Sequence, residues 1–231
     1  MFDLALLWSI FPALLTGARL TLVLTALVIL VGIALALPVA LCKNSGFRGL
    51  RAAANAYVLF FRGTPALVQL FLLYYGAGQF EFVRDSHLWP VLRDPFWCVV
   101  IALGLNSASY AGKTLAAALD AIPRGIREAA FVLGLSRAHA FWRIDLPLAM
   151  RTALPALGND VILTCKATSL ASTVTLLELT GTARLLTSET YAPYEVFFGA
   201  GLVYLAINYL LMSSLRRLER NLNLQASPQP S

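Results

Sequence analysis

The sequence predicts an all-α protein that crosses a membrane five times, with its N-terminus outside and its C-terminus in the cytoplasm. Of 231 residues, 58% are hydrophobic and only 13% are charged, whereas soluble domains carry about 25% charged residues. Apolar stretches close to the roughly 20 residues that a helix needs to cross a bilayer recur along the chain. Arginines and lysines gather at the ends of these stretches, as membrane topology requires.

The predicted elements follow the apolar pattern in order. Residues 1–19 lack the basic segment and cleavage site of a signal peptide and are expected to form an amphipathic helix at the membrane interface. Residues 20–218 form the transmembrane domain. Its spans are expected at about 20–41, 65–78 (begun by a helical stretch at 55–61), 96–118, 147–177 and 194–215. The polar residues 219–231, with two prolines, are predicted to be disordered.

Charge sets the orientation. The loops after the first and third spans and the C-terminal tail share twelve arginines and lysines, and that side is expected to be cytoplasmic. The opposite side has four arginines mixed with acidic residues, among them Glu178, Glu189 and Glu195. These three carboxylates allow three interpretations: attraction of a cationic amino acid, contact with a binding protein, or ordinary solvated loop charges.

A polar hairpin, residues 124–147, is expected between the third and fourth spans. Pro123 can begin a helix without losing a hydrogen bond, Gly134 can end it in the left-handed conformation, and Ser136 can cap a second helix. Arg124 and Glu128 are one turn apart and can pair. The sequence therefore predicts two short helices joined by a hinge.

The surface of this hairpin is suited to contact with another molecule. Ala129 and Ala130 leave a bare strip that another surface can approach, and Phe131 and Leu133 stand beside it as apolar anchors. Glu128 offers a charged contact. The pattern alone allows two interpretations, a connector lying on lipid headgroups or a site for a soluble partner.

A longer pattern distinguishes these interpretations. The order E-A-A, three residues, G, nine residues, I-x-L-P is matched without a gap by Glu128, Ala129, Ala130, Gly134, Ile144, Leu146 and Pro147. It resembles the EAA loop of bacterial ABC importer permeases. Further segments resemble the permeases for polar amino acids, in particular those of the histidine, arginine and opine type. These segments are Arg62-Gly63-Thr64-Pro65, Lys166-Ala167-Thr168-Ser169-Leu170 and Glu178-Leu179.

The resemblance implies a multi-pass subunit of the bacterial inner membrane. Its partners would be an ABC ATPase dimer, a second permease (identical or related) and a periplasmic substrate-binding protein. ATP and magnesium would be bound by the ATPase, so this chain would hold no cofactor and catalyse nothing. The hairpin would be the coupling helix, contacting the ATPase through Glu128, Ala129, Ala130, Phe131, Leu133 and Gly134.

Two residues depart from the family pattern. Ile126 stands where a glutamine is frequent, and Lys113 stands near the cytoplasmic end of the third span where an acidic residue is usual. The second departure puts in doubt any transfer of a polar network around that span. It leaves the coupling role unchanged.

Other signals are weaker. Residues 111–114, Ala-Gly-Lys-Thr, resemble the end of a phosphate-binding loop, but Ser107 replaces the required glycine and the segment ends an apolar helix. We therefore expect no ATP binding by this chain. Three cysteines and two histidines show no metal-ligand spacing. The basic residues form no stripe with aromatics, so nucleic acid is not expected as a partner.

Polar residues within the spans are candidates for a substrate path. Asn106, Ser109 and Tyr110 on the third span could line a path or simply join helices, and these interpretations stay equal. Lys166 could lie near the cytoplasmic end and extend to the interface. The match of Lys166, Thr168 and Ser169 to the family favours a structural or gating role over substrate contact.

Three alternatives to an amino-acid importer remain. One is an ABC permease for another small solute, and another is a secondary transporter without an ATPase. The last, a membrane-embedded enzyme, needs a cluster of ionisable residues within the spans. Only Lys113, Lys166 and Asp160 stand there.

Overall fold

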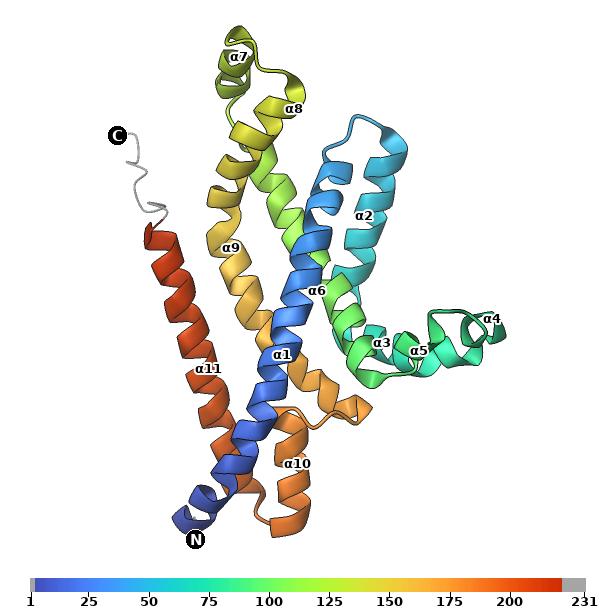
Figure 1. Ribbon diagram of the computed structural model, residues 1–231, viewed down its shortest axis with the longest axis vertical. Helices are drawn as coiled ribbons and strands as arrows, with labels where there is room; N and C mark the ends of the chain where they lie inside the picture. Colours follow the sequence, from blue (N-terminus) through green and yellow to red (C-terminus); the bar gives the residue numbers. More distant parts are fainter. Residues whose placement is uncertain (1–2, 222–231) are drawn as a thin grey trace.

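The computed structural model describes residues 3–221, which are helical and contain no strand. Figure 1 shows long helices that cross one another in a bundle, with a helical hairpin at one end and an arm of short helices on one side. The long helices are α1 (Leu4–Lys43), α2 (Arg48–Gly63), α6 (Pro95–Asp120), α9 (Leu146–Ala167) and α11 (Pro193–Asn221). The all-helical class is as predicted.

Shorter helices connect the long ones. The arm between α2 and α6 is made of α3, a π-helical turn, a 3-10 turn and two single-turn helices, α4 and α5. Their bounds are Ala66–Phe71, Leu72–Gly76, Ala77–Gln79, Glu81–Arg84 and Trp89–Leu92. Elsewhere the short elements are α7 (Arg124–Val132), α8 (Arg137–Ala140), a π-helical turn (Phe141–Asp145), a 3-10 helix (Thr168–Val174) and α10 (Leu179–Thr190).

Helix α1 is one continuous helix of 40 residues, about 60 Å long. The Asp3 carboxylate caps its first turn by accepting from the amides of Ala5 and Leu6 at 2.9 and 3.1 Å. The interfacial helix and the first span that the sequence predicts on either side of residue 19 are thus parts of the same helix. Leu14 and its buried neighbours pack against α10 and α11, so this half of α1 belongs to the bundle.

The most extensive packing between two helices of the described chain is between α1 and α6. A Cβ atom on Gly104 would lie 2.7 Å from Val31 Cγ1, and one on Gly112 would lie 2.6 Å from Val39 Cγ1. Both glycines thus face α1 where the two backbones approach. Small residues serve this purpose in membrane helices, because lipid gives no hydrophobic drive for helix association.

The chain bends by 104° between α2 and α3, at residues 64–65. The Gln69 side chain stabilises the bend by donating to the Phe61 and Thr64 carbonyls at 3.0 and 3.1 Å and to Thr64 Oγ1 at 2.7 Å. The predicted second span, 65–78, is only a short helix followed by irregular turns. Within residues 3–221, α1 and α11 are each long and apolar enough to cross a membrane, and up to four such units exist if each bent pair counts as one.

Glu178 is fully buried and joins three helices, so the alternative of a solvated loop charge is excluded for this residue. Its Oε1 accepts from the Gly181 amide at 2.9 Å and caps α10. Its Oε2 accepts from Tyr204 of α11 at 3.0 Å and from Thr21 of α1 at 3.3 Å. Helix α10 itself was not predicted from the sequence.

The C-terminal prediction is corrected in part. Helix α11 extends to Asn221, so residues 219–221 are helical although they were predicted to be disordered. The remainder of that prediction, 222–231, lies outside the described residues.

We predict that Gly112→Leu forces α1 and α6 apart, because the new side chain would occupy the position of Val39. Overpacking of this kind lowers the free energy of unfolding by about 1–3 kcal/mol. Thermal unfolding of the purified chain in detergent should show a lower Tm. Gly201→Leu is the matched control, because no atom lies within 4 Å of a Cβ at Gly201. A Tm equally lowered in both variants would contradict the close contact.

Candidate functional site

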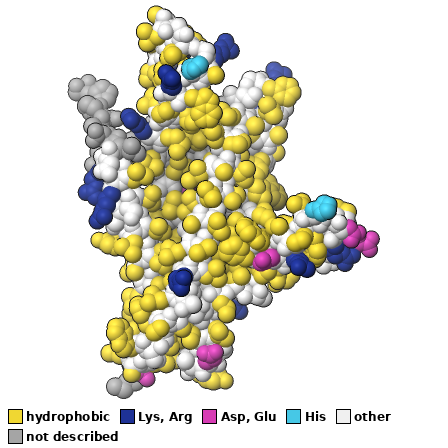
Figure 2. All heavy atoms as spheres, in the orientation of Figure 1, with side chains coloured by type: hydrophobic (Ala, Val, Ile, Leu, Met, Phe, Trp, Pro, Cys, Tyr) yellow, Lys and Arg dark blue, Asp and Glu magenta, His cyan; other side chains and the backbone are white. Residues whose placement is uncertain are grey.

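The hairpin α7–α8 forms one end of the molecule (Figure 1) and is the part that the EAA pattern identifies. Figure 2 shows apolar side chains over the middle of the bundle, basic side chains near the hairpin end, and acidic ones on the arm and at the opposite end. The two short helices with a hinge between them are as predicted. The hairpin is thus a polar, projecting element on an apolar body.

Gly134 ends α7 as predicted, with φ of +77°. The Leu135 amide donates to the Ala130 carbonyl at 3.1 Å, and the Gly134 amide donates to the Phe131 carbonyl at 3.0 Å. These two bonds define a Schellman motif, which satisfies carbonyls that the helix end leaves unpaired. A residue with a Cβ atom is strained at this φ, which explains the glycine in the pattern.

The second half of the hairpin runs into the bundle without a loop. Ser136 caps α8 as predicted, accepting from the His139 amide at 3.4 Å. A π-helical turn, Phe141–Asp145, follows α8 directly and leads into α9 at Leu146. A displacement of α8 is therefore passed to α9 along continuous helical backbone.

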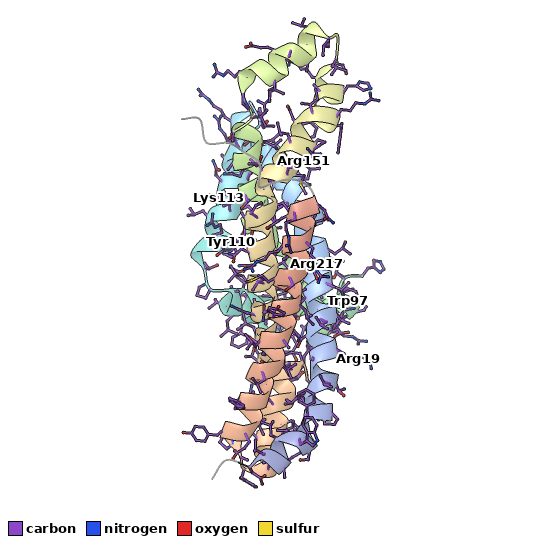
Figure 3. The ribbon with its side chains drawn as sticks, turned by 90° about the vertical axis from the view of Figure 1, so that its left-hand side faces the viewer. Arg19, Trp97, Tyr110, Lys113, Arg151 and Arg217 are labelled. Atoms are coloured by element: carbon purple, nitrogen blue, oxygen red, sulfur yellow. The ribbon has the colours of Figure 1, made fainter. Side chains whose placement is uncertain are left out.

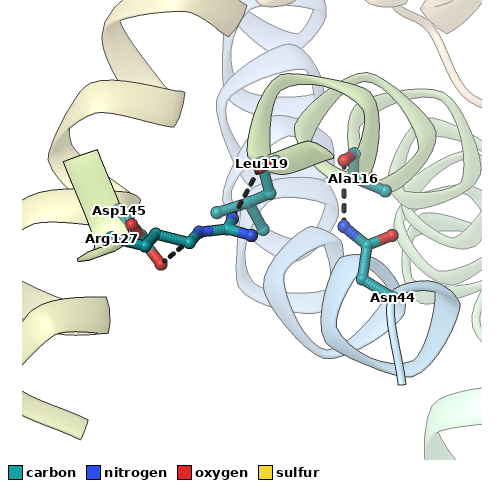
Figure 4. Close-up of polar contacts among 5 residues, drawn as sticks. All are labelled: Asn44, Ala116, Leu119, Arg127 and Asp145. Carbon is teal, nitrogen blue, oxygen red and sulfur yellow. Dashed lines mark hydrogen bonds and ion pairs between the residues drawn. The ribbon is translucent and has the colours of Figure 1, made fainter. Parts of the chain in front are cut away.

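Arg127 ties the hairpin to the bundle, as Figure 4 shows. Its Nε lies 3.2 Å from Asp145 Oδ2, and its Nη2 donates to the Leu119 carbonyl at 2.8 Å. This side chain of α7 thereby joins its helix to the end of α6 and to the turn before α9. On the neighbouring side Asn44 Nδ2 donates to the Ala116 carbonyl at 3.0 Å, joining the end of α1 to α6.

The sequence analysis missed this contact. It predicted a pair between Arg124 and Glu128, which is absent from the ion pairs of residues 3–221. Arg127 and Asp145 are 18 positions apart, so helical spacing gives no signal for their contact. Their charges were visible, but only the fold of the hairpin brings them together.

The outer surface of the hairpin is apolar and open. Phe131, Val132 and Leu133 are 51%, 87% and 79% exposed, and Glu128 and Ala129 are exposed beside them. Val132 was not among the predicted contact residues, although its place in the same run could have identified it. Ala130 is only 2% exposed and faces its own chain. Its predicted role in the bare strip is therefore wrong.

The predicted path residues divide into two groups. Asn106 and Tyr110 line a cavity of about 170 Å³ between α6 and α9. Asn106 also joins helices, since its Nδ2 donates to the Phe61 carbonyl at 2.9 Å and to Gln69 Oε1 at 3.0 Å. Ser109 is buried and donates to the Asn106 carbonyl at 2.7 Å, away from the cavity.

The other predicted path residues are not in this cavity. Thr168 and Ser169 donate to carbonyls of their own helix, those of Cys165 and Lys166, each at 2.7 Å. Lys166 is exposed and lies 20 residues, about 30 Å of helix, beyond the hairpin end of α9. It therefore lies at the end of α9 that is remote from the hairpin.

Asp160 lines the cavity opposite Asn106 and Tyr110, and was not among the predicted path residues. Its Oδ2 is a buried atom without a hydrogen-bond partner in the described chain. Buried polar atoms are nearly always paired. Asp160 is therefore a residue of the cavity lining that has a carboxylate oxygen without a partner among the described residues.

The apparent phosphate-binding segment is helical. Residues 111–114 lie inside α6, and Gly112 packs against Val39 of α1. A phosphate-binding loop instead needs free backbone amides after a strand. The segment is part of an apolar helix as expected, but it does not end that helix, because α6 continues to Asp120.

Comparison with known proteins identifies the architecture. Residues 28–224 match the family described as "Binding-protein-dependent transport system inner membrane component". The chain belongs to this family. The permease is therefore a component of the inner membrane and a transport subunit, and ATP hydrolysis lies in a partner subunit.

Several relatives of the permease carry named functions. It is 44% identical over 218 residues to the octopine transport system permease protein of Rhizobium radiobacter, covering 94% of this chain and 89% of that one. It is 42% identical to the nopaline transport system permease protein of Agrobacterium fabrum, covering 90% of this chain and 87% of that one. It is also 42% identical to the arginine ABC transporter permease of Escherichia coli K12, covering 72% of this chain and 74% of that one.

Solved structures agree with this assignment. The permease matches the crystal structure of an amino acid ABC transporter with histidines at a TM-score of 0.83 and 31% identity, covering 96% of this chain and 99% of that one. A chain of the MetNI methionine ABC transporter matches at a TM-score of 0.75 and 18% identity, covering 92% and 97%. The second match shows the fold alone.

We predict that Arg127→Ala loosens the hairpin, because Asp145 loses its counter-charge and the Leu119 carbonyl loses a donor. A loss of about 1.4 kcal/mol of local stability raises the equilibrium constant for local opening about tenfold. Amide hydrogen exchange in residues 124–140 should be about tenfold faster. Arg124→Ala is the control, because Arg124 is exposed and forms no ion pair in the described chain. Equal exchange in both variants would contradict the tie.

Proposed function

We propose that this permease is the membrane subunit of an ABC importer for polar amino acids or opine-like derivatives, coupled to a separate ATPase through α7–α8. The observation that carries the proposal is the exposed run Phe131–Leu133 on a hairpin with the EAA pattern. The relatives named for octopine, nopaline and arginine support the cargo class. A periplasmic binding protein would deliver the substrate, as the family description implies.

The hairpin can bind a cleft through burial of apolar surface. Fully burying a side chain of this size contributes about 1.5–3 kcal/mol, and Val132 and Leu133 are largely exposed. Glu128 lies beside them and adds a charged contact that orients the hairpin. Ala129 lets the partner approach the backbone. Ala130 is buried and supports the helix from inside.

Coupling follows from how the hairpin is attached. The π-helical turn joins it to α9, and Arg127 joins it to the end of α6. These are the two helices that enclose the cavity of Asn106 and Asp160. Movement of the hairpin would therefore change the cavity walls. ATP would drive this movement only by binding the closed ATPase dimer better than the open one.

Five spans and a cytoplasmic hairpin remain our assignment of topology. Support comes from helices that overlap each predicted span: α1, α2 with α3, α6, α9 with its 3-10 continuation, and α11. Basic side chains near the hairpin end and acidic ones at the opposite end agree with a cytoplasmic hairpin. A second permease, identical or related, would complete the path.

The cavity between α6 and α9 is the proposed part of that path. Asn106, Tyr110 and Asp160 supply its polar lining. The unpaired Asp160 oxygen suits the ammonium or guanidinium group of an amino acid. Lys166, Thr168 and Ser169 would act outside this cavity, in holding the end of α9.

We predict that Phe131→Asp prevents stable assembly with the ATPase, because a carboxylate would enter an apolar cleft. Co-purification in mild detergent should be lost. Phe82→Asp is the matched control, since Phe82 is 74% exposed on the arm remote from the hairpin. Retention of the ATPase by Phe131→Asp would instead favour a transporter that needs no ATPase.

We also predict that Glu128→Lys and Gly134→Trp abolish substrate-stimulated ATP hydrolysis in the reconstituted complex. The first reverses the charged contact. The second strains the left-handed end of α7, at about 1–2 kcal/mol. Both proteins should still insert in the membrane. Transport at the wild-type rate by both would refute the coupling role.

A test of the path uses Asp160→Asn, which keeps the shape and removes the charge. Uptake of arginine should fall by about tenfold, the effect of one charge-assisted contact. Assembly with the ATPase should persist, since the hairpin is unchanged. Uptake equal to that of the wild type would exclude Asp160 from the path.

A further inference from the structure

A groove of about 520 Å³ lies between α1 and α11. Its walls are apolar except at Thr16 and Arg19, and Arg19 is the single charged residue among the described residues that line it. Leu22 of α1 and Leu210 of α11 are exposed along the groove. We call it the α1–α11 groove. It combines one cation with an open apolar surface.

Arg19 has no acidic partner in this chain. Both ion pairs of residues 3–221 lie elsewhere, and the guanidinium forms no hydrogen bond with a residue of that range. The hydroxyl of Thr16 donates to the Pro12 carbonyl of its own helix at 3.2 Å. Residues 1–2 and 222–231 contain neither aspartate nor glutamate. No acidic side chain of the permease therefore balances the charge of Arg19.

The charge of Arg19 is permanent, because a guanidinium stays protonated in proteins. A cation on the apolar surface of a membrane protein is costly, and residues of this kind are functional by default. The cost falls when the side chain reaches the membrane surface or meets an anion. The depth of Arg19 in the bilayer therefore decides which groups it can meet.

Arg19 lies about one bilayer thickness from the hairpin end of α1. Lys43, the last residue of α1, is 24 residues further along, about 36 Å of helix, and the hydrocarbon core of a bilayer is about 30 Å thick. Leu20, the next residue, belongs to the same apolar cluster as Phe96, and the charged Asp94 caps α6 at Phe96. In the proposed topology Arg19 is therefore at the level of the outer lipid head groups.

The α1–α11 groove faces away from the proposed path. Figure 3 shows Tyr110, which lines the path cavity, toward one edge of the molecule and Arg19 toward the opposite edge. A second permease that completes the path would adjoin the edge of Tyr110. The bilayer is therefore the expected neighbour of the groove.

We propose that the α1–α11 groove binds an anionic phospholipid of the outer leaflet, with its phosphate on Arg19 and an acyl chain along Leu22 and Leu210. The planar guanidinium offers paired donors that match two phosphate oxygens. Leu22 and Leu210 lie on the hairpin side of Arg19, which is the direction that an acyl chain takes from an outer head group. A head group with a net negative charge fits best, because Arg19 has no other counter-charge. The inference rests on the proposed topology, and it is independent of the cargo.

The test is retention of lipid by the purified complex of the permease with its partners. Dioleoyl phosphatidylglycerol or dioleoyl phosphatidylcholine is added in mild detergent, and bound lipids are counted by native mass spectrometry. The wild type should bind phosphatidylglycerol more tightly than phosphatidylcholine. Arg19→Gln should raise the dissociation constant of one phosphatidylglycerol about tenfold, the effect of one lost charge-assisted contact. Arg19→Lys should keep the preference for the anionic lipid.

Two further variants separate the parts of the site. Ala206 is exposed and lines the groove, so the indole of Ala206→Trp would occupy the space of the acyl chain while Arg19 remains. Retention of phosphatidylglycerol should fall in this variant too. Arg124→Gln is the matched control for loss of a cation, because Arg124 is exposed on the hairpin and forms no ion pair in the described chain. Its retention should equal that of the wild type.

Three results would overturn the proposal. Equal retention of phosphatidylglycerol by the wild type and Arg19→Gln would exclude Arg19 from a lipid site. Displacement of the lipid by free glycerol 3-phosphate would assign Arg19 to a phosphate site that needs no acyl chain. Loss of the second permease from Arg19→Gln, with lipid retention unchanged, would make the groove a protein interface. None of these measurements uses transport, so arginine uptake tests the proposed function separately.

Discussion

Helices α1 and α6 approach so closely that glycine is required at their contact, and the working parts of the permease depend on this crossing. The middle of α6 lines the cavity of Asp160, and its end carries the hairpin. Lipid gives no hydrophobic drive for helices to associate, so contact rests on close packing and hydrogen bonds. Gly104 and Gly112 let α1 serve as a fixed support against which α6 is held.

Irregular backbone in the bundle is compensated by buried polar side chains. An unpaired backbone group in a membrane costs several kcal/mol, so breaks in helices need partners inside the protein. Gln69 supplies donors at the bend after α2, and Glu178 supplies acceptors at the start of α10. Both residues also bond to other helices, through Asn106 and Tyr204. The bends are thereby fixed in position relative to the bundle.

Local features could be predicted from sequence, and contacts across the fold could not. The Gly134 helix end and the Ser136 cap depend on neighbouring residues and were predicted correctly. The contact of Arg127 with Asp145 and the burial of Glu178 depend on segments brought together only by folding. Hydropathy located apolar stretches but did not reveal the bend at 64–65, because it reports how apolar a segment is and not the direction in which the chain runs.

The uninterrupted backbone from α8 to α9 has a mechanical consequence. Asp160 lies 14 residues beyond Leu146, about 21 Å along a stiff helix. A rod of that length, tilted by roughly six degrees at one end, shifts the other end by about 2 Å. Pro155 lies between them, and α9 continues through it as one helix. The two ends are therefore expected to move together, and residues inserted in the turn 141–145 would uncouple the cavity from the hairpin.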